Sequence, residues 1–104
     1  MSQKVYVVQT GPNSYKVDPP TIKVSGGHDF FLVNATTQGL VVRLPKGSSS
    51  ANADIEHVVA KGKKQSIDTI PQPNNETRAY QYRVKMDSGE TAEGNSDPIL
   101  IIEH

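Results

Sequence analysis

The chain has 104 residues, which fits one domain able to bury roughly 65% of the surface that its unfolded form exposes. Lys plus Arg and Asp plus Glu both number 11, so the formal net charge is zero and the chain offers no basic surface for nonspecific nucleic-acid binding. The absence of cysteine excludes disulfides, thiolate nucleophiles and every metal site that needs a thiolate.

The first half of the chain alternates short apolar runs with turn-forming clusters. The opening run is rich in β-branched and aromatic residues, and a Gly-Pro-Asn-Ser cluster ends it. The consecutive prolines Pro19 and Pro20 exclude a central strand at their position. Asp29–Asn34 is the densest apolar run, which predicts a strand buried on both faces or near a sheet centre. We expect strands over Lys4–Gln9, Tyr15–Val17, Thr21–Val24 and Asp29–Asn34.

The second half continues the pattern with longer loops. Pro45–Asp54 and Asp87–Asp97 exceed the length of a tight hairpin, so they are the loops most relevant to function. No helical pattern of three turns occurs. We expect strands over Leu40–Leu44, Ile55–Val59, Gln65–Ile70, Ala79–Met86 and Pro98–Ile102.

Short strands spaced by about 8 to 12 residues predict an all-β protein with an antiparallel sandwich or barrel. No internal repeat or dividing linker occurs, so residues 1–104 are expected to form a single domain.

Several segments carry a family resemblance. The turn Gly26–Asp29 leads into the aromatic-rich run Phe30–Asn34, which ends in an asparagine. Tyr80–Val84 places aromatic residues at alternate positions, and Ser96–Ile102 is a closing apolar strand. Together these segments resemble the cupredoxins, the Greek-key β-sandwich family of the blue-copper proteins. The resemblance covers most of the chain and implies a Greek-key sandwich.

The copper ligands of that family are missing. Its first histidine stands a few residues after the terminal asparagine, where this chain has Gly39. The resemblance puts the cysteine position at Val84, the second histidine near Asp87 or Ser88, and the methionine near Ala92. A blue-copper site needs two imidazoles and a thiolate. The resemblance therefore implies the fold without the electron-transfer role, with Val84 filling a hydrophobic core.

Other residues that attract attention have plain structural interpretations. His28 lies in a Gly-Gly turn, and His57 lies beside Glu56 without the spacing of a chelate. Met86 fits core packing. Tyr80 and Tyr82 are expected to pack across the sandwich with their hydroxyls at the rim, rather than to line a small pocket at the copper position.

No catalytic constellation can be assembled, so we expect no enzyme and predict no catalytic, cofactor-binding or metal-ligating residue. The groups considered are the carboxylates Asp54, Glu56, Asp68 and Asp87, the loop serines Ser48–Ser50, the basic turn Lys61–Lys64, the Gly26–Gly27 pair, and the glycosylation sequons at Asn34 and Asn75.

We therefore expect a non-enzymatic, copper-less cupredoxin-like module that acts in binding or structure through a sheet edge or one loop end. Its partner is expected to be a protein or small molecule, without nucleic acid or cofactor, and the chain to be a monomer. Two alternatives stay open. One is a metal-handling (copper or zinc) protein with a different site built from His28, His57, Met86 or carboxylates. The other is an immunoglobulin-like adhesion domain with another strand order.

The beginning of the chain bears on compartment. Met1–Val5 lacks the charged head and apolar middle of a secretory signal, so the chain as it stands predicts a cytoplasmic protein. Removal of a signal would instead make it periplasmic or secreted, and we expect a bacterial source. No apolar stretch approaches the roughly 18 to 20 residues that cross a bilayer. His104 carries no argument, since it resembles the remainder of a purification tag.

Overall fold

The computed structural model describes residues 3–92 and 97–103. Nearly every predicted strand is present within about two residues of its expected bounds. The elements are β1 (Gln3–Gly11), β2 (Ser14–Asp18), β3 (Thr21–Ser25), β4 (Asp29–Ala35), β5 (Leu40–Leu44), β6 (Ile55–Val59), β7 (Lys64–Asp68), the 3₁₀ turn η1 (Pro73–Asn75), β8 (Arg78–Gln81), β9 (Arg83–Met86) and β10 (Ile99–Glu103).

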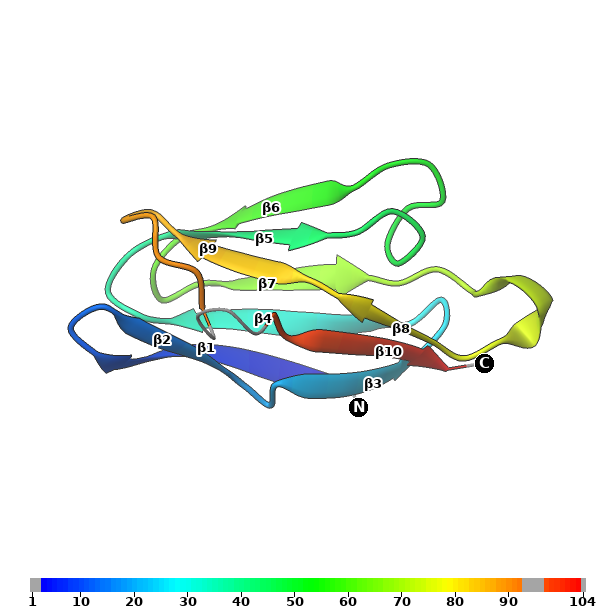
Figure 1. Cartoon of the computed structure of the whole chain (residues 1–104), viewed down its shortest axis with the longest axis horizontal. Helices are drawn as coiled ribbons and strands as arrows, with labels where there is room; N and C mark the ends of the chain where they lie inside the picture. The colour runs from blue at the N-terminus through cyan, green and yellow to red at the C-terminus, as the bar shows by residue number, and fades with distance from the viewer. Residues whose placement is uncertain (1–2, 93–96, 104) are drawn as a thin grey trace.

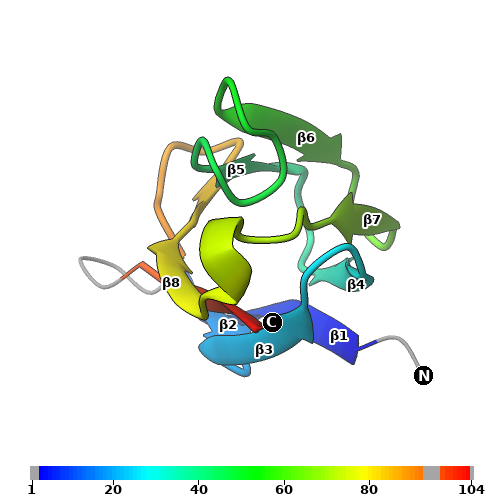
Figure 2. The ribbon, with the colours of Figure 1, turned by 90° about the vertical axis from the view of Figure 1, so that its right-hand side faces the viewer.

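The strands form two layers that enclose one core (Figures 1 and 2). The first layer is a four-stranded sheet in the order β2-β1-β4-β7. The second layer consists of two three-stranded sheets, β3-β10-β8 and β6-β5-β9. These two sheets are continuous through the chain, because β8 runs into β9 at Tyr82. The prolines that follow β2 let the chain leave the first layer and enter the second as β3.

Alternation along the strands decides which side chains enter the core. Successive residues of a strand point to opposite faces, and β2 and β3 show the buried–exposed pattern of a sheet with one wet face. The hydrophobic core consists of Val5, Val7, Tyr15, Val17, Ile22, Val24, Phe30, Leu32, Leu40, Val42, Leu44, Val59, Ile67, Tyr82, Val84, Met86, Ala92, Leu100 and Ile102.

Three features of the pairing differ from the sequence prediction. The expected strand over Ala79–Met86 is divided at Tyr82, whose N–H donates to the carbonyl of Pro98 at 3.0 Å. β8 therefore pairs with β10, while β9 pairs with β5. Two strand pairs, β1–β4 and β10–β3, are parallel, although the spacing had indicated antiparallel pairing. Parallel pairs arise where the chain crosses between layers before returning.

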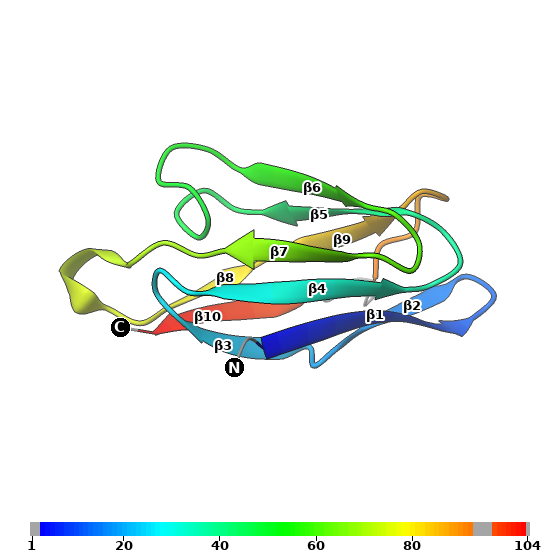
Figure 3. The same ribbon diagram turned by 180° about the vertical axis from the view of Figure 1, so that it is seen from behind.

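β4 is central in its sheet, as expected, but it is buried on one face only. Phe30 and Leu32 are fully buried, whereas Phe31 and Val33 are half-buried on the outer face. Figure 3 looks onto this outer face, and none of the described elements lies in front of it. The described residues contain no helix long and apolar enough to cross a membrane.

Phe30 and Phe31 offer a matched test of the two faces. Phe30→Ala should lower the free energy of unfolding by about 3 to 5 kcal/mol, because it leaves a cavity between the layers. Phe31→Ala should cost roughly 1 to 2 kcal/mol, since that ring stays partly in water. Urea denaturation measures both changes. Equal losses would contradict the assignment of Phe31 to the outer face.

Candidate functional site

The structure brings together the positions that correspond to the copper ligands. The backbone N–H of Asp87 donates to the carbonyl of Gly39 at 3.0 Å, and the N–H of Ala92 donates to the carbonyl of Val84 at 2.8 Å. Val84 also lies opposite Val42 in the β5–β9 pairing. The end of β9, the start of β5 and the loop after β9 therefore meet at one end of the sandwich, where the resemblance placed them.

This end is closed by packing. Val84 and Ala92 are fully buried, and Met86 is 2% exposed, so the inner face is continuous with the hydrophobic core. The carboxylate of Asp87 lies directly against Gly39, because a Cβ added to that glycine would stand 2.6 Å from Oδ2 of Asp87. An acidic side chain thus occupies the space next to the position of the first histidine.

Asn34 holds the loops at this end. Its Nδ2 donates to the carbonyls of Gln38 at 2.8 Å and Val59 at 3.0 Å, and its Oδ1 accepts from the N–H and the hydroxyl of Thr36. The side chain is fully buried, so every one of these bonds replaces one to water. The Asn34 side chain therefore holds the surrounding loops by hydrogen bonds, and the sequon is not an exposed attachment site.

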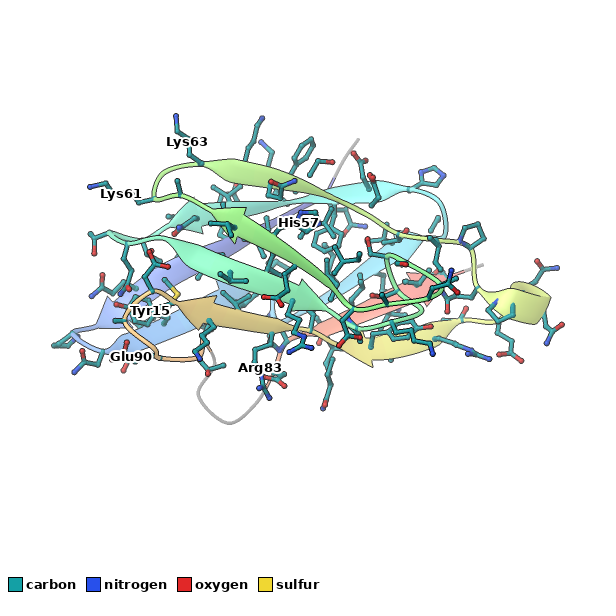
Figure 4. The ribbon with its side chains drawn as sticks, turned by 90° about the horizontal axis from the view of Figure 1, so that it is seen from above. Tyr15, His57, Lys61, Lys63, Arg83 and Glu90 are labelled. Carbon is teal, nitrogen blue, oxygen red and sulfur yellow. The ribbon has the colours of Figure 1, made fainter. Side chains whose placement is uncertain are left out.

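A second set of polar contacts covers the rim. Gln38 Nε2 donates to the Tyr15 hydroxyl at 2.5 Å, and Gln38 Oε1 accepts from the N–H of Ser88 at 2.7 Å. The Ser88 hydroxyl in turn bonds Glu90. Figure 4 shows Tyr15 and Glu90 at this same end. The β4–β5 loop is thereby tied both to β2 and to the loop after β9.

The residues present do not fit a blue-copper centre. Val84 and Ala92 offer only hydrocarbon, and Gly39 has no side chain. Asp87 supplies a hard oxygen donor, whereas a blue-copper site requires a thiolate and two imidazoles. The geometry of the cupredoxin ligand end is kept, and its coordinating chemistry is replaced by core packing.

The residues of the metal-handling alternative lie on separate elements. His28 is exposed in the turn between β3 and β4, His57 is half-buried on β6 opposite Val42, and Met86 is in the core. Within residues 3–92 and 97–103, no group of three or more His, Cys, Asp or Glu side chains is arranged to hold a metal. His104 lies outside the described residues.

The two tyrosines have different roles. Tyr82 packs across the sandwich, with its ring 6.4 Å from that of Phe30, as predicted. The prediction that its hydroxyl reaches the rim is wrong, because the residue is only 1% exposed. The Tyr80 hydroxyl donates to Gln72 and lines a recess of about 400 Å³ that also includes Pro71 and Arg78. Glu76 raises the pKa of Arg78 by hydrogen bonding and charge.

The two long loops meet at a shallow, charged recess. Arg43 and Arg83 lie opposite each other on β5 and β9, and both line this space of about 230 Å³. Arg43 pairs with Asp54 at the end of the first loop, and Arg83 contacts Asp97 at the end of the second. Residues 93–96 of the second loop lie outside the described part. Asp97 is half-buried and the other three side chains of these ion pairs are exposed, and the charges balance.

Sequence reasoning missed the outer face of the first layer. Four apolar side chains share it, and β-sheet register places them next to one another. We call this surface the outer apolar face and define it as Tyr6, Val8, Phe31 and Val33. Tyr6 is 42% exposed. The sequence did contain a signal for this face, since apolar residues occupy both odd and even positions of β1 and β4 and therefore lie on both faces. That pattern also fits a strand buried on both faces.

A two-layer sandwich with these strand orders, and without a thiolate or imidazole at the ligand positions, defines a cupredoxin-like fold that lacks the copper ligands. Among solved structures, the chain is similar to the reduced Cu(I) form, at pH 4, of a proline-to-glycine mutant of amicyanin. That similarity has a TM-score of 0.67 and 16% identity over 98% of this chain and 82% of the other.

Amicyanin from Paracoccus versutus (Thiobacillus versutus) is similar, with a TM-score of 0.66 and 17% identity over 98% of this chain and 81% of the other. At these identities the likeness shows the fold alone. It leaves the immunoglobulin-like alternative without support. No protein-family model matches the chain, and no curated protein matches its sequence.

Measurements of stability test whether the Asn34 side chain holds the surrounding loops. Asn34→Ala should lower the free energy of unfolding by about 2 to 3 kcal/mol, because it removes the side chain that bonds the buried Val59 carbonyl and the Thr36 N–H. Asn52→Ala, on an exposed loop, is the matched control and should change it by less than about 0.5 kcal/mol. Urea denaturation measures both. An equal effect of the two substitutions would contradict the role of Asn34 in holding the loops.

The convergence of the ligand positions can be tested by restoring the ligands. The triple variant Gly39→His, Val84→Cys and Asp87→His should acquire Cu(II) binding with an intense thiolate absorption band in the visible spectrum. The parent chain, without a histidine tag, should bind Cu(I), Cu(II) and Zn(II) no tighter than about 10 μM by calorimetry. A folded triple variant without the band would contradict the convergence, and tighter binding by the parent would favour the metal-handling alternative.

Proposed function

We propose that this chain is a non-enzymatic binding module, a cupredoxin-like sandwich that contacts a protein partner through its outer apolar face. The observation that carries the proposal is the exposure of Tyr6, 42% of its surface, beside three further apolar side chains on a sheet that no described element covers. Contiguous exposed apolar surface on a soluble domain marks an interaction site more often than chance.

In the second layer, the outer face of the sheet β6-β5-β9 is different. Its outward positions form one row of Val58, Val41 and Lys85 and a neighbouring row of Glu56, Arg43 and Arg83, so the two valines lie side by side next to a charged row. Val58 is 77% exposed but has only Val41 as an apolar neighbour in register. The charged residues of this face are Arg43, Glu56, Arg83 and Lys85. A solvated surface accounts for such a pattern.

Support for a non-enzymatic role comes from the placement of the reactive groups. The Ser48 hydroxyl is buried and donates to the carbonyl of Pro45 at 2.7 Å, on a loop whose residues 45–54 include no histidine. Asp54 pairs with Arg43 and also accepts the N–H of Lys46, which gives it a loop-bracing role. Asp87 lies against Gly39 at the other end. These positions favour structure over acid–base chemistry.

Site-specific photocrosslinking tests the proposal. A photoreactive phenylalanine analogue replaces Tyr6 in one variant and Lys85, on the opposite outer face, in the matched control. Irradiation in cells of the source organism should give protein adducts from position 6 at several times the yield from position 85. A partner that needs an apolar surface will contact only the first face.

Two results would contradict the proposal. If adducts form mainly from position 85, or if position 6 gives none above the unirradiated background, the outer apolar face is not the contact surface. Circular dichroism of both variants establishes that the sandwich is intact, so that loss of crosslinking is not loss of fold.

A further inference from the structure

One row of residues runs straight across the first layer. Register pairs Tyr6 of β1 with Asp18 of β2 on one side and with Val33 of β4 on the other, and Val33 in turn pairs with Lys64 of β7. All four residues face outward, and the charged ones at the two ends have opposite signs. The row is Asp18, Tyr6, Val33 and Lys64.

This row of residues is complementary to a second copy of itself related by a two-fold axis. A two-fold axis parallel to the strands, between β1 and β4, exchanges the two ends of the row when one copy of the face is laid on another. Asp18 of each copy then stands opposite Lys64 of the other, and Tyr6 stands opposite Val33. The axis keeps the strands of the two sheets aligned, which is a common arrangement of face-to-face sheet packing, at about 10 Å.

We propose that a second copy of this chain is the partner that covers the outer apolar face, packed about this two-fold axis with reciprocal Asp18–Lys64 ion pairs. This inference rests on the proposed function, which identifies the face as the contact surface. Charge complementarity selects the occupant, because one and the same row supplies the acid, the apolar centre and the base.

The neighbouring row supports the same geometry. Lys4 pairs in register with Phe31, and within one copy the ammonium of Lys64 already lies 5.0 Å from the centre of the Phe31 ring. The two-fold axis places Lys4 of the second copy over Phe31, where it takes over this cation–π contact while Lys64 turns to Asp18 of that copy. Lys16, which pairs with Val8 in the third outward row, lies on the edge strand β2, where its ammonium stays in water at the rim.

The size of the face sets the strength of the association. Three outward rows on four strands cover about 400 Å² per copy, from the usual strand and residue spacings. Stable interfaces cover about 800 Å² per partner, so the dissociation constant is expected between about 10 μM and 1 mM. The chain is then monomeric in dilute solution, in line with the expectation from its sequence, and dimeric where it is concentrated.

Sedimentation equilibrium of the purified chain, from about 10 μM to 1 mM in about 50 mM salt, tests the inference. The average mass should rise from 11.3 kDa toward twice that value. Asp18→Lys and Lys64→Asp should each raise the dissociation constant at least about 10-fold, because each sets like charges opposite one another. The double exchange Asp18→Lys with Lys64→Asp should restore it to within about 3-fold.

Two further variants keep the test decisive if an exchange disturbs folding. Tyr6→Ser removes the apolar centre and should also abolish the dimer, whereas Val58→Ser, on the other outer face, should leave it unchanged. A chain that stays monomeric at 1 mM, or a dimer lost in Val58→Ser and kept in Tyr6→Ser, overturns the inference. Crosslinks from position 6 to a different protein, with a monomeric purified chain, would overturn it while leaving the proposed function intact.

Discussion

The contact between Phe30 and Tyr82 joins the two layers at the point on which the rest of the sandwich depends. Phe30 projects inward from the centre of the first sheet, and its ring lies 6.4 Å from that of Tyr82. Tyr82 stands where the chain stops pairing with β10 and begins to pair with β5. The second layer therefore keeps its continuity through one buried aromatic residue, which fixes how β8 and β9 lie over the first layer.

The same constraint explains what has happened at the ligand end. Val84 is two residues beyond Tyr82 and so points into the same interior, where a thiolate would face a metal in a blue-copper protein. With valine there, and with Ala92 beside it, the interior continues to the end of the sandwich. Asn34 and Gln38 supply polar contacts that hold the surrounding loops. Apolar packing and hydrogen bonds therefore close this end.

Because one end is closed, the contact surface that we propose lies on the sheets. The outer face of the sheet β6-β5-β9 carries a charged row and surface ion pairs, which interact well with water. The outer apolar face of the first layer carries Tyr6 and Phe31 with Lys64 nearby, and exposes aromatic surface at a place without loops. A contact there needs no movement of the fold, since rigid strands position every side chain in advance.

The sequence by itself determined the strands, most of their bounds, the shared face of Tyr82 and Val84, and the missing ligands. Alternation is a local property of extended backbone, so Val84 and Tyr82 could be assigned to one face from their spacing alone. The family resemblance then located Gly39, Val84, Asp87 and Ala92, and the structure brings them together.

Only the tertiary structure decided the parallel pairs, the change of partner at Tyr82 and the neighbours of Tyr6. Between Tyr6 and Val33 the chain forms β2, crosses to the second layer as β3 and returns, so their contact depends on register between distant segments. Local pattern carries no information on that register when both faces of a strand are apolar, because a slip by one residue then costs little. The packing of the whole sandwich determines which face of β1 and β4 stays exposed to water.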